Sequence, residues 1–234
     1  VAVHGSATQA CGLKWFEKKI YSYIEKLTVK MADGIFGVSD YVAAWDVCKY
    51  AKKNYGRIYN IVRFEENSEN SDSLTTFREE TGIREDDIVV TSTGRITTDK
   101  GYDILWDAIQ KLEPKENVKF VIVGDGNYKD EFVNQVENSA YKNNVIFTGY
   151  RSDVHAILKE SDIFVICTKH ETLCISLLEA AINQLPMIAS DVGGIPEIVD
   201  DSCGSLVEVG DAEGFAQAIS EYANDEDLRK EKGA

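Results

Sequence analysis

Two glutamates, Glu171 and Glu179, stand eight residues apart in the stretch KHETLCISLLEAAINQLPMIASDVGGIPEIV, residues 169 to 199. An ionised carboxylate only accepts hydrogen bonds, so each glutamate could bind sugar hydroxyl groups. A helical rise of about 1.5 Å per residue would separate them by about 12 Å along a helix axis. That spacing suits an elongated ligand with a central diphosphate and a hydroxyl-rich sugar at each end. Taken singly, either is more often a surface acid, and Glu171 could simply favour the helix dipole.

Two basic residues, Arg95 and Lys100, lie in the segment TGRITTDKG, residues 93 to 101. They follow a predicted strand, and Gly94 and Gly101 flank them. Glycines let backbone amides approach a ligand, and two cations can neutralise a diphosphate. The alternative is a solvated loop with two ordinary surface cations. Their position at the carboxyl end of a strand favours a binding site.

The helix that follows Glu171 offers a third candidate for ligand binding. If it begins near Leu173, the amides of Leu173, Cys174 and Ile175 lack partners within the helix. Helix starts of this kind bind phosphate groups. The sequence therefore predicts that these amides point toward the same ligand as the two glutamates.

The segment VGDGNYKDEF, residues 123 to 132, contains a GxG pair formed by Gly124 and Gly126. A dinucleotide-binding fingerprint needs a third glycine, and Lys129 occupies that position. The segment also follows an internal strand instead of the first one. The pair therefore indicates a tight turn whose backbone could contact a nucleotide, and an NAD(P) site is rejected.

These residues need a scaffold, and from about residue 86 short apolar strands alternate with amphipathic helices. Strands are expected at 87–94, 118–124, 144–150, 162–168, 186–190 and 204–209, with helices near 102–112, 128–141, 153–160, after Glu171, at 195–200 and at 211–223. This alternation predicts an α/β fold, a doubly wound parallel sheet covered on both faces. The loops after residues 94, 124, 150 and 168 then share the carboxyl edge, where such sheets bind ligands.

The first 65 residues follow a different pattern. Apolar residues at three- and four-residue spacings predict a helix over 14–32, then a strand at 35–39 and a helix beginning at Ser39 or Asp40. The opening VAVHGS is typical of the end of a buried strand, so we expect a partial second domain and a longer parent protein. The polar segment 66–73 is expected to be a flexible loop.

Bulk composition narrows the possible partners. The 234 residues include 25 Lys plus Arg against 40 Asp plus Glu, and the net charge of −15 argues against binding a nucleic-acid backbone. The five cysteines are an odd number without CxxC spacing, which fits a reducing cytosol better than a disulfide framework or a zinc site. The longest apolar runs have the length of strands, so neither a transmembrane helix nor a signal peptide is expected.

Together the motifs resemble a known family. ETLCISLLEA, with its Glu-x7-Glu spacing, and LPMIASDVGGIPEIV resemble the donor-binding domain of retaining glycosyltransferases of the GT-B fold, of the glycosyltransferase family 4 type. GRITTDKG, VIVGDG, VIFTGY and SDIFVICT fall in the expected order. The resemblance implies that residues 66–234 are a Rossmann-like domain that binds a nucleoside diphosphate sugar. Residues 1–65 would be a remnant of the acceptor-side domain and its crossover.

The resemblance also implies site roles. Glu171 would hold hydroxyls of the donor sugar, and Glu179 would accept from the ribose hydroxyls. Arg95 and Lys100 would stabilise the departing diphosphate, whose charge grows as the glycosidic bond breaks. The other implied site residues are Leu173, Cys174 and Ile175 near the diphosphate, Gly94, Gly124, Gly126, Tyr150 and Arg151 in the rest of the donor site, and His4 as an active-site histidine. Cys174 departs from the family pattern, which commonly has glycine there.

The resemblance implies an enzyme of the hexosyltransferase type. It would transfer a sugar from a nucleoside diphosphate donor such as a UDP-sugar, with retained configuration, without a cofactor and without an essential metal. The products would be polysaccharides, glycolipids or glycoproteins, and the fragment alone would be inactive. Two alternatives remain: a nucleotide-sugar-binding module or partner subunit without turnover, and a sugar-nucleotide 2-epimerase of the same fold.

The basic helix at 14–30 bears on localisation. It has five lysines against two glutamates, a net charge of +3 within an acidic chain. A basic amphipathic helix fits peripheral contact with the cytoplasmic face of a membrane, where family members often act on lipid-linked acceptors. An ordinary helix with its apolar stripe in an interface between domains fits equally well.

Overall fold

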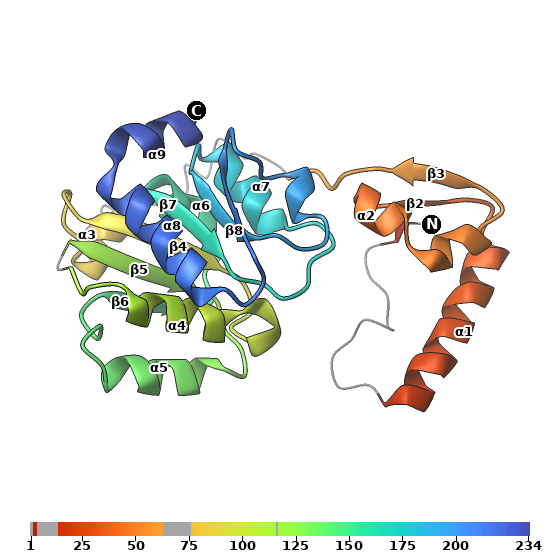
Figure 1. Ribbon diagram of the computed structural model, residues 1–234, viewed down its shortest axis with the longest axis horizontal. Helices are drawn as coiled ribbons and strands as arrows, with labels where there is room; N and C mark the ends of the chain where they lie inside the picture. Colours follow the sequence, from red (N-terminus) through yellow and green to blue (C-terminus); the bar gives the residue numbers. More distant parts are fainter. Residues whose placement is uncertain (1, 4–13, 63–75, 116) are drawn as a thin grey trace. The chain divides into compact units, whose positions relative to one another are not determined.

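A computed structural model of the chain describes residues 2–3, 14–62, 76–115 and 117–234 (Figure 1). His4 and the polar segment 66–73 lie outside these residues. The chain divides into two compact units. Unit 1 comprises Val1–Ile61 with two short segments, His170–Cys174 and Gly193–Glu197, and unit 2 comprises Val62–Lys169, Ile175–Val192 and Ile198–Ala234.

Unit 2 is built around a six-stranded sheet in which every pair of neighbouring strands is parallel. In sheet order the strands are β6 (Val145–Gly149), β5 (Val118–Val123), β4 (Ile88–Thr93), β7 (Ile163–Ile166), β8 (Met187–Ser190) and β9 (Gly204–Val207). The α/β fold with a parallel sheet, predicted from the alternating strands and helices, is confirmed.

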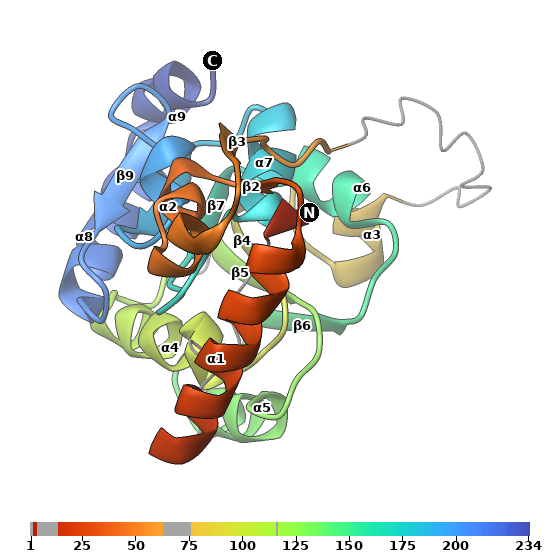
Figure 2. The same ribbon diagram turned by 90° about the vertical axis from the view of Figure 1, so that its right-hand side faces the viewer.

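Helices cover both faces of this sheet. They are α3 (Phe77–Thr81), α4 (Tyr102–Lys111), α5 (Lys129–Glu137), α6 (Val154–Lys159), α7 (Ile175–Ile182), α8 (Ala212–Asn224) and α9 (Glu226–Lys232), with the 3-10 turn η3 (Thr98–Lys100). Side chains alternate across a strand, so Phe120 and Ile122 join one apolar cluster while Val121 and Val123 join another. The first cluster takes in α4, α5 and α8, and the second takes in α3 and α6, which lie together in Figure 2.

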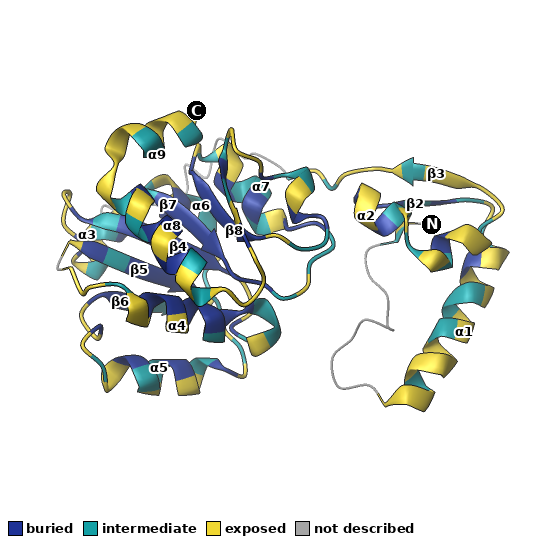
Figure 3. Cartoon of the chain, in the orientation of Figure 1, coloured by how far each residue is buried: buried dark blue, intermediate teal, exposed yellow. Residues whose placement is uncertain are grey.

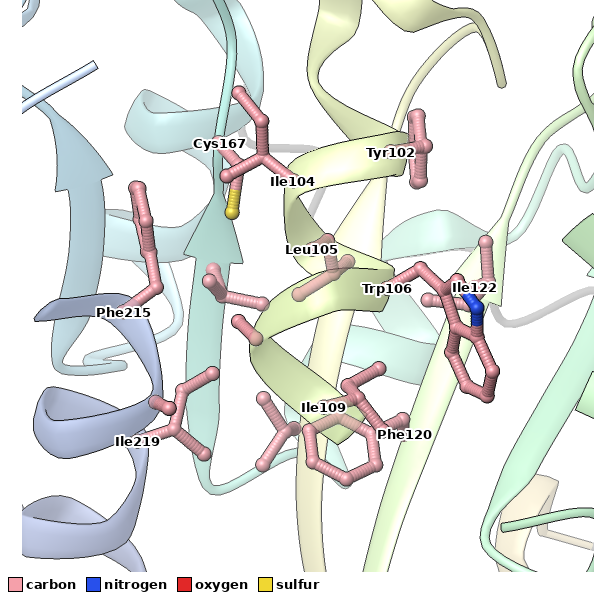
Figure 4. Close-up of a cluster of buried hydrophobic side chains, with 14 of the residues drawn as sticks. Tyr102, Ile104, Leu105, Trp106, Ile109, Phe120, Ile122, Cys167, Phe215 and Ile219 are labelled. Atoms are coloured by element: carbon pink, nitrogen blue, oxygen red, sulfur yellow. The ribbon is translucent and has the colours of Figure 1, made fainter. Parts of the chain in front are cut away.

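The larger cluster supplies most of the packing in unit 2. Leu105 and Ile109 of α4 lie among Phe215 and Ile219 of α8 and the strand residue Phe120 (Figure 4). The strands beneath them are almost entirely buried (Figure 3). Full burial of one such side chain contributes about 1.5–3 kcal/mol to folding. This core makes the sheet a stiff base for the loops at its carboxyl edge.

Unit 1 contains a three-stranded parallel sheet with the order β1 (Ala2–Val3), β2 (Ile35–Gly37) and β3 (Asn54–Arg57). Between β1 and β2 runs α1 (Trp15–Met31), and α2 (Asp40–Ala43) and η2 (Asp46–Tyr50) follow β2. Ser39 caps α2, because its hydroxyl accepts a hydrogen bond from the amide of Val42. The small core gathers Val29, Ile35 and Cys48. The short turn η4 (Ile195–Glu197) also belongs to unit 1.

Within the described residues, no helix combines the length and the apolar character needed to span a membrane.

Candidate functional site at the carboxyl edge

The sheet of unit 2 has one topological switch point. The chain runs from β4 to β5 and β6 on one side, then returns to place β7 on the other side of β4. β4 and β5 pair in register up to Thr93 and Val123, so their loops start level with each other. In open parallel sheets, ligands bind outside the carboxyl ends of the strands at such a point. The loops after β4 and β7 are therefore the expected position of a ligand-binding site.

The loops after β4 and β5 are joined backbone to backbone. The amide of Gly94 donates to the oxygen of Val123 at 3.0 Å, and the amide of Ile96 donates to the oxygen of Asp125 at 2.9 Å. A side chain at Gly124 would overlap the backbone oxygen of Gly94, and one at Gly126 would overlap that of Ile96. The GxG pair therefore allows close approach of two loops, which places its backbone at the ligand edge.

Arg95 and Lys100 follow β4 as predicted. The Arg95 side chain is exposed and has no hydrogen-bond or ion-pair partner among the described residues, whereas Lys100 is half-buried in η3. Asp99 lies between them in sequence. A hydrogen bond from Thr97 lowers the pKa of the Asp99 carboxyl, burial opposes this, and the charges of Arg95 and Lys100 lower it further. The loop thus presents two cations whose charges are close enough to Asp99 to lower the pKa of its carboxyl.

Tyr150 and Arg151 follow β6, and the structure gives them different surroundings. The Tyr150 side chain is 83% exposed. Arg151 is held by two carboxylates, with Nη1 at 2.6 Å from Glu80 and Nη2 at 2.7 Å from Asp153. The hydrogen bonds that Arg151 donates to the carboxylates of Asp153 and Glu80 raise the pKa of its guanidinium above the ordinary value. Tyr150 is therefore available to a ligand, while Arg151 links α3 to the loop after β6.

Glu179 lies in the second turn of α7 and is half-buried. Its carboxylate has no hydrogen-bond or ion-pair partner in the part of the chain that is described. Burial raises the pKa of this carboxyl. Removing a carboxylate from water without a compensating partner is unfavourable, so such a group is poised to accept hydrogen bonds from a ligand.

The helix after β7 begins two residues later than the sequence predicts. α7 starts at Ile175, so its first amides belong to Ile175, Ser176 and Leu177. Leu173 and Cys174 precede it, and both side chains are buried. Both belong to unit 1, whereas α7 belongs to unit 2, a division that the apolar pattern alone did not reveal. Of the three predicted amides, that of Ile175 lies in the first turn.

Glu171 lies in unit 1, where two glycines and a serine contact the backbone oxygens of Glu171 and the next residue, Thr172. A Cβ at Gly193 would overlap the backbone oxygen of Glu171, and one at Gly194 would overlap that of Thr172. The Ser39 hydroxyl donates to the same oxygen of Thr172 at 2.7 Å. The carboxylate of Glu171 accepts from the Thr172 amide at 3.0 Å. The position of this predicted site residue is thus fixed by segments that the sequence analysis did not connect with it.

Glu197 completes this arrangement in unit 1. Its two carboxylate oxygens accept from the amides of Asp40 and Tyr41, each at 2.8 Å, and the Tyr59 hydroxyl donates to it at 3.1 Å. A carboxylate at the first amides of a short helix replaces the partners those amides lack. Glu197 therefore anchors the Gly193–Glu197 segment to the start of α2.

Another contact escaped sequence reasoning. Lys169, two residues before Glu171, forms an ion pair with Asp103 at 2.6 Å. The sequence gives no spacing signal for this pair, since the two residues are 66 positions apart. Only the pairing of β4 with β7 brings their segments together.

A cavity of about 660 Å³ lies elsewhere in unit 2, between the end of α4, the start of β5 and α8. None of the described site residues lines it. It opens at the amino end of β5, so it is separate from the carboxyl edge at which sheets of this kind bind ligands.

Comparison with known proteins identifies the family. The family model of glycosyl transferases group 1 matches residues 74–233. N-acetyl-alpha-D-glucosaminyl L-malate synthase of Bacillus anthracis is 29% identical over 161 residues, covering 68% of this chain and 42% of that protein. The chain spans about half the length of the curated relatives it matches.

Solved structures show the same fold. Alr3699/HepE of Anabaena in complex with UDP matches with a TM-score of 0.82 at 20% identity, over 99% of this chain and 64% of that one. WaaG, a glycosyltransferase involved in lipopolysaccharide biosynthesis, matches with a TM-score of 0.76 at 22% identity, over 92% of this chain and 61% of that one. At these identities the likeness concerns the fold, which is that of GT-B glycosyltransferases.

Proposed function

The chain belongs to the glycosyl transferases group 1 family, and on that premise we propose that it is the donor-binding part of a retaining GT-B glycosyltransferase of the family 4 type. The longer protein would transfer a hexose-type sugar from a nucleoside diphosphate donor to an acceptor. Because the Anabaena structure with this fold contains UDP, UDP-sugars are the first donors to test.

The observation that carries this proposal is the state of Glu179. A half-buried carboxylate with a raised pKa and no hydrogen-bond partner among the described residues needs a donor from outside the chain. The paired hydroxyls of a ribose supply two such donors. Tyr150, which follows β6 and is exposed, would stack on the base of the same nucleotide.

The chemistry we propose is electrostatic. As the glycosidic bond breaks, negative charge grows on the departing diphosphate, and Arg95, Lys100 and the first amides of α7 would stabilise it. These groups would supply the charge stabilisation that a metal ion often supplies, so we propose that transfer needs no essential metal or cofactor. Glu171 would hold hydroxyls of the donor sugar, and His4 keeps its proposed place among the active-site residues.

For the acceptor we propose a lipid-linked glycan at the cytoplasmic face of a membrane, with products in polysaccharide or glycolipid synthesis. Support comes from α1, whose Trp15 and Met31 are 72% and 82% exposed. Lysines accompany these apolar side chains, and Lys19 lies over the Trp15 ring. Exposed apolar groups beside cations suit an anionic lipid surface.

Donor hydrolysis by the full-length protein tests the proposal without knowledge of the acceptor. The protein is incubated with UDP-glucose, UDP-N-acetylglucosamine and GDP-mannose, and the released sugar is followed by NMR before its anomers equilibrate. We expect one donor to release the α anomer, and Glu171→Gln to lower the rate about 100-fold or more. Glu208→Gln, an exposed glutamate outside the site, should leave the rate unchanged.

Release of the β anomer would contradict retention, and no hydrolysis of any donor would contradict the activity. Formation of a sugar epimerised at C2 would instead identify a 2-epimerase.

A further inference from the structure

Lys169 and Asp103 join the two loops that meet at the switch point of unit 2. Lys169 follows β7, and Asp103 lies in the first turn of α4. Their ion pair, Nζ to Oδ2 at 2.6 Å, is about two-thirds shielded from solvent, with side-chain exposures of 33% and 35%. At this shielding an ion pair is stronger than one at a fully exposed surface.

Three further contacts bind the same two segments. The Lys169 amide donates to the backbone oxygen of Asp99 at 3.1 Å, and the Thr168 hydroxyl donates to that oxygen at 3.5 Å. Gly101 has a φ of +72°, and a Cβ there would overlap the backbone oxygen of Cys167. We call residues 99–103 and 167–169, held by these contacts, the loop clasp. Lys100 lies inside it, and Glu171 follows two residues after its end.

Asp103 depends on Lys169. The Oδ1 atom of Asp103 is buried without a hydrogen-bond partner in the described chain, and Oδ2 has Lys169 as its only partner among those residues. Removing the lysine charge would leave a shielded carboxylate with no compensation. Such a group is costly, so the carboxylate would turn toward water and the clasp would loosen.

We propose that Lys169 is a positioning residue for the donor site, acting through Asp103. The pair fixes the loop after β4, with its two cations, against the segment that leads to Glu171. The charge of Lys169 is neutralised by Asp103, so Lys169 is not a third cation for the diphosphate. This inference rests on the proposed glycosyl transfer, since it concerns the same site.

Kinetics of the full-length protein test the role. With UDP-glucose, or whichever of the three donors the wild-type protein hydrolyses, Lys169→Met should lower kcat about 10- to 100-fold while the donor KM changes less than about threefold. Asp103→Asn should do the same. The double variant should be no slower than either single one, because the pair acts as a unit. Lys169→Arg keeps the charge and should recover most of the rate.

The control is Lys111→Met, which breaks the ion pair with Glu213 at the other end of α4. It should leave kcat unchanged. Loss of thermal stability in Lys169→Met with kcat retained would overturn the positioning role, and so would multiplied losses in the double variant.

Hydrogen exchange tests the clasp without activity. Lys169→Met should speed amide exchange in residues 99–103 and 167–169, and unchanged exchange there would overturn the clasp. If the wild-type protein turns over no donor, the proposed function fails, and exchange still decides whether Lys169 holds the two loops together.

Discussion

The backbone of Gly193 lies directly against the backbone oxygen of Glu171, so closely that a Cβ at Gly193 would overlap that oxygen. Gly193 also has a φ of +62°, in the left-handed region that favours glycine. The segment after β8 thus sets the position of the glutamate proposed to hold the donor sugar. Glycine is required there for two reasons, conformation and space.

Gly193→Ala should therefore impair function beyond its cost in stability. The added methyl group must displace Glu171, and a shift of about 1 Å at a reacting group can cost about 100-fold in rate. The matched control is Gly210→Ala, which has a φ of +88° but no atom within 4 Å of an added Cβ. Donor hydrolysis and thermal unfolding of both variants check this. Equal rates in the two variants would contradict it.

Replacing the cations after β4 should reduce turnover. Arg95→Ala and Lys100→Ala each remove a charge that we propose stabilises the departing diphosphate, so kcat/KM should fall about 100- to 1000-fold. Lys142→Ala, which removes an exposed cation elsewhere in unit 2, should have little effect. Steady-state kinetics of the three variants would decide, and retention of full activity by both site variants would rule out the electrostatic mechanism.

The adjacent residues Tyr150 and Arg151, which follow β6, should affect different properties: Tyr150 nucleotide affinity and Arg151 stability. Tyr150→Ala removes a ring that is mostly exposed to solvent, so the stability of the fold should stay constant. Nucleotide affinity should drop about 10-fold or more, because the base loses its stacking partner. Arg151→Met breaks the pairs with Glu80 and Asp153 and should cost about 1 kcal/mol of stability. Calorimetric binding and denaturant unfolding measure the two effects separately.

The Arg151 network also predicts a pH dependence. Hydrogen bonds from Arg151 lower the pKa of both Glu80 and Asp153. Their contribution to stability is therefore present above the ordinary carboxyl range and is lost as the pH falls through the lowered pKa values. The stability difference between wild-type protein and Arg151→Met should shrink in acid. A difference that stays constant from neutral pH to about pH 3 would contradict this.

The contribution of Glu179 to stability should depend on pH in the opposite direction. Burial raises the pKa of its carboxyl, so its contribution to stability is greatest below the ordinary glutamate pKa and is lost as the pH rises through the raised value. Glu179→Gln should then be more stable than the wild-type protein near pH 7, with the advantage fading toward pH 4. Thermal unfolding across this pH range measures it, and a variant less stable than wild type at neutral pH would oppose the account.

The fold was predictable because its signals are local. Apolar, β-branched runs such as 87–94 and 118–124 predicted strands that the structure places at Ile88–Thr93 and Val118–Val123. The short helix Glu226–Lys232 was not predicted, although Asp225 caps it by accepting from the Leu228 amide. It has no buried residue, so its sequence lacks the apolar stripe that predicts a helix.

Contacts that arrange the candidate site were not predictable in the same way. The ion pair of Lys169 with Asp103 and the hydrogen bond from Ser39 to Thr172 join residues 66 and 133 positions apart. Only the strand order, with β7 beside β4, brings the first pair together. The start of α7 was misplaced by two residues, because Leu173 and Cys174 are buried in a loop and extend the apolar pattern of the helix.

The most direct test of the donor site is calorimetric titration of this chain with UDP, GDP and ADP, alongside Glu179→Ala and Glu137→Ala. Glu137 is an exposed glutamate at the end of α5, so its replacement is the control. We predict that one diphosphate binds, that Glu179→Ala weakens its binding about 10-fold or more, and that Glu137→Ala does not. Binding unaffected by Glu179→Ala, or no binding of any of the three, would contradict the donor site proposed for this chain.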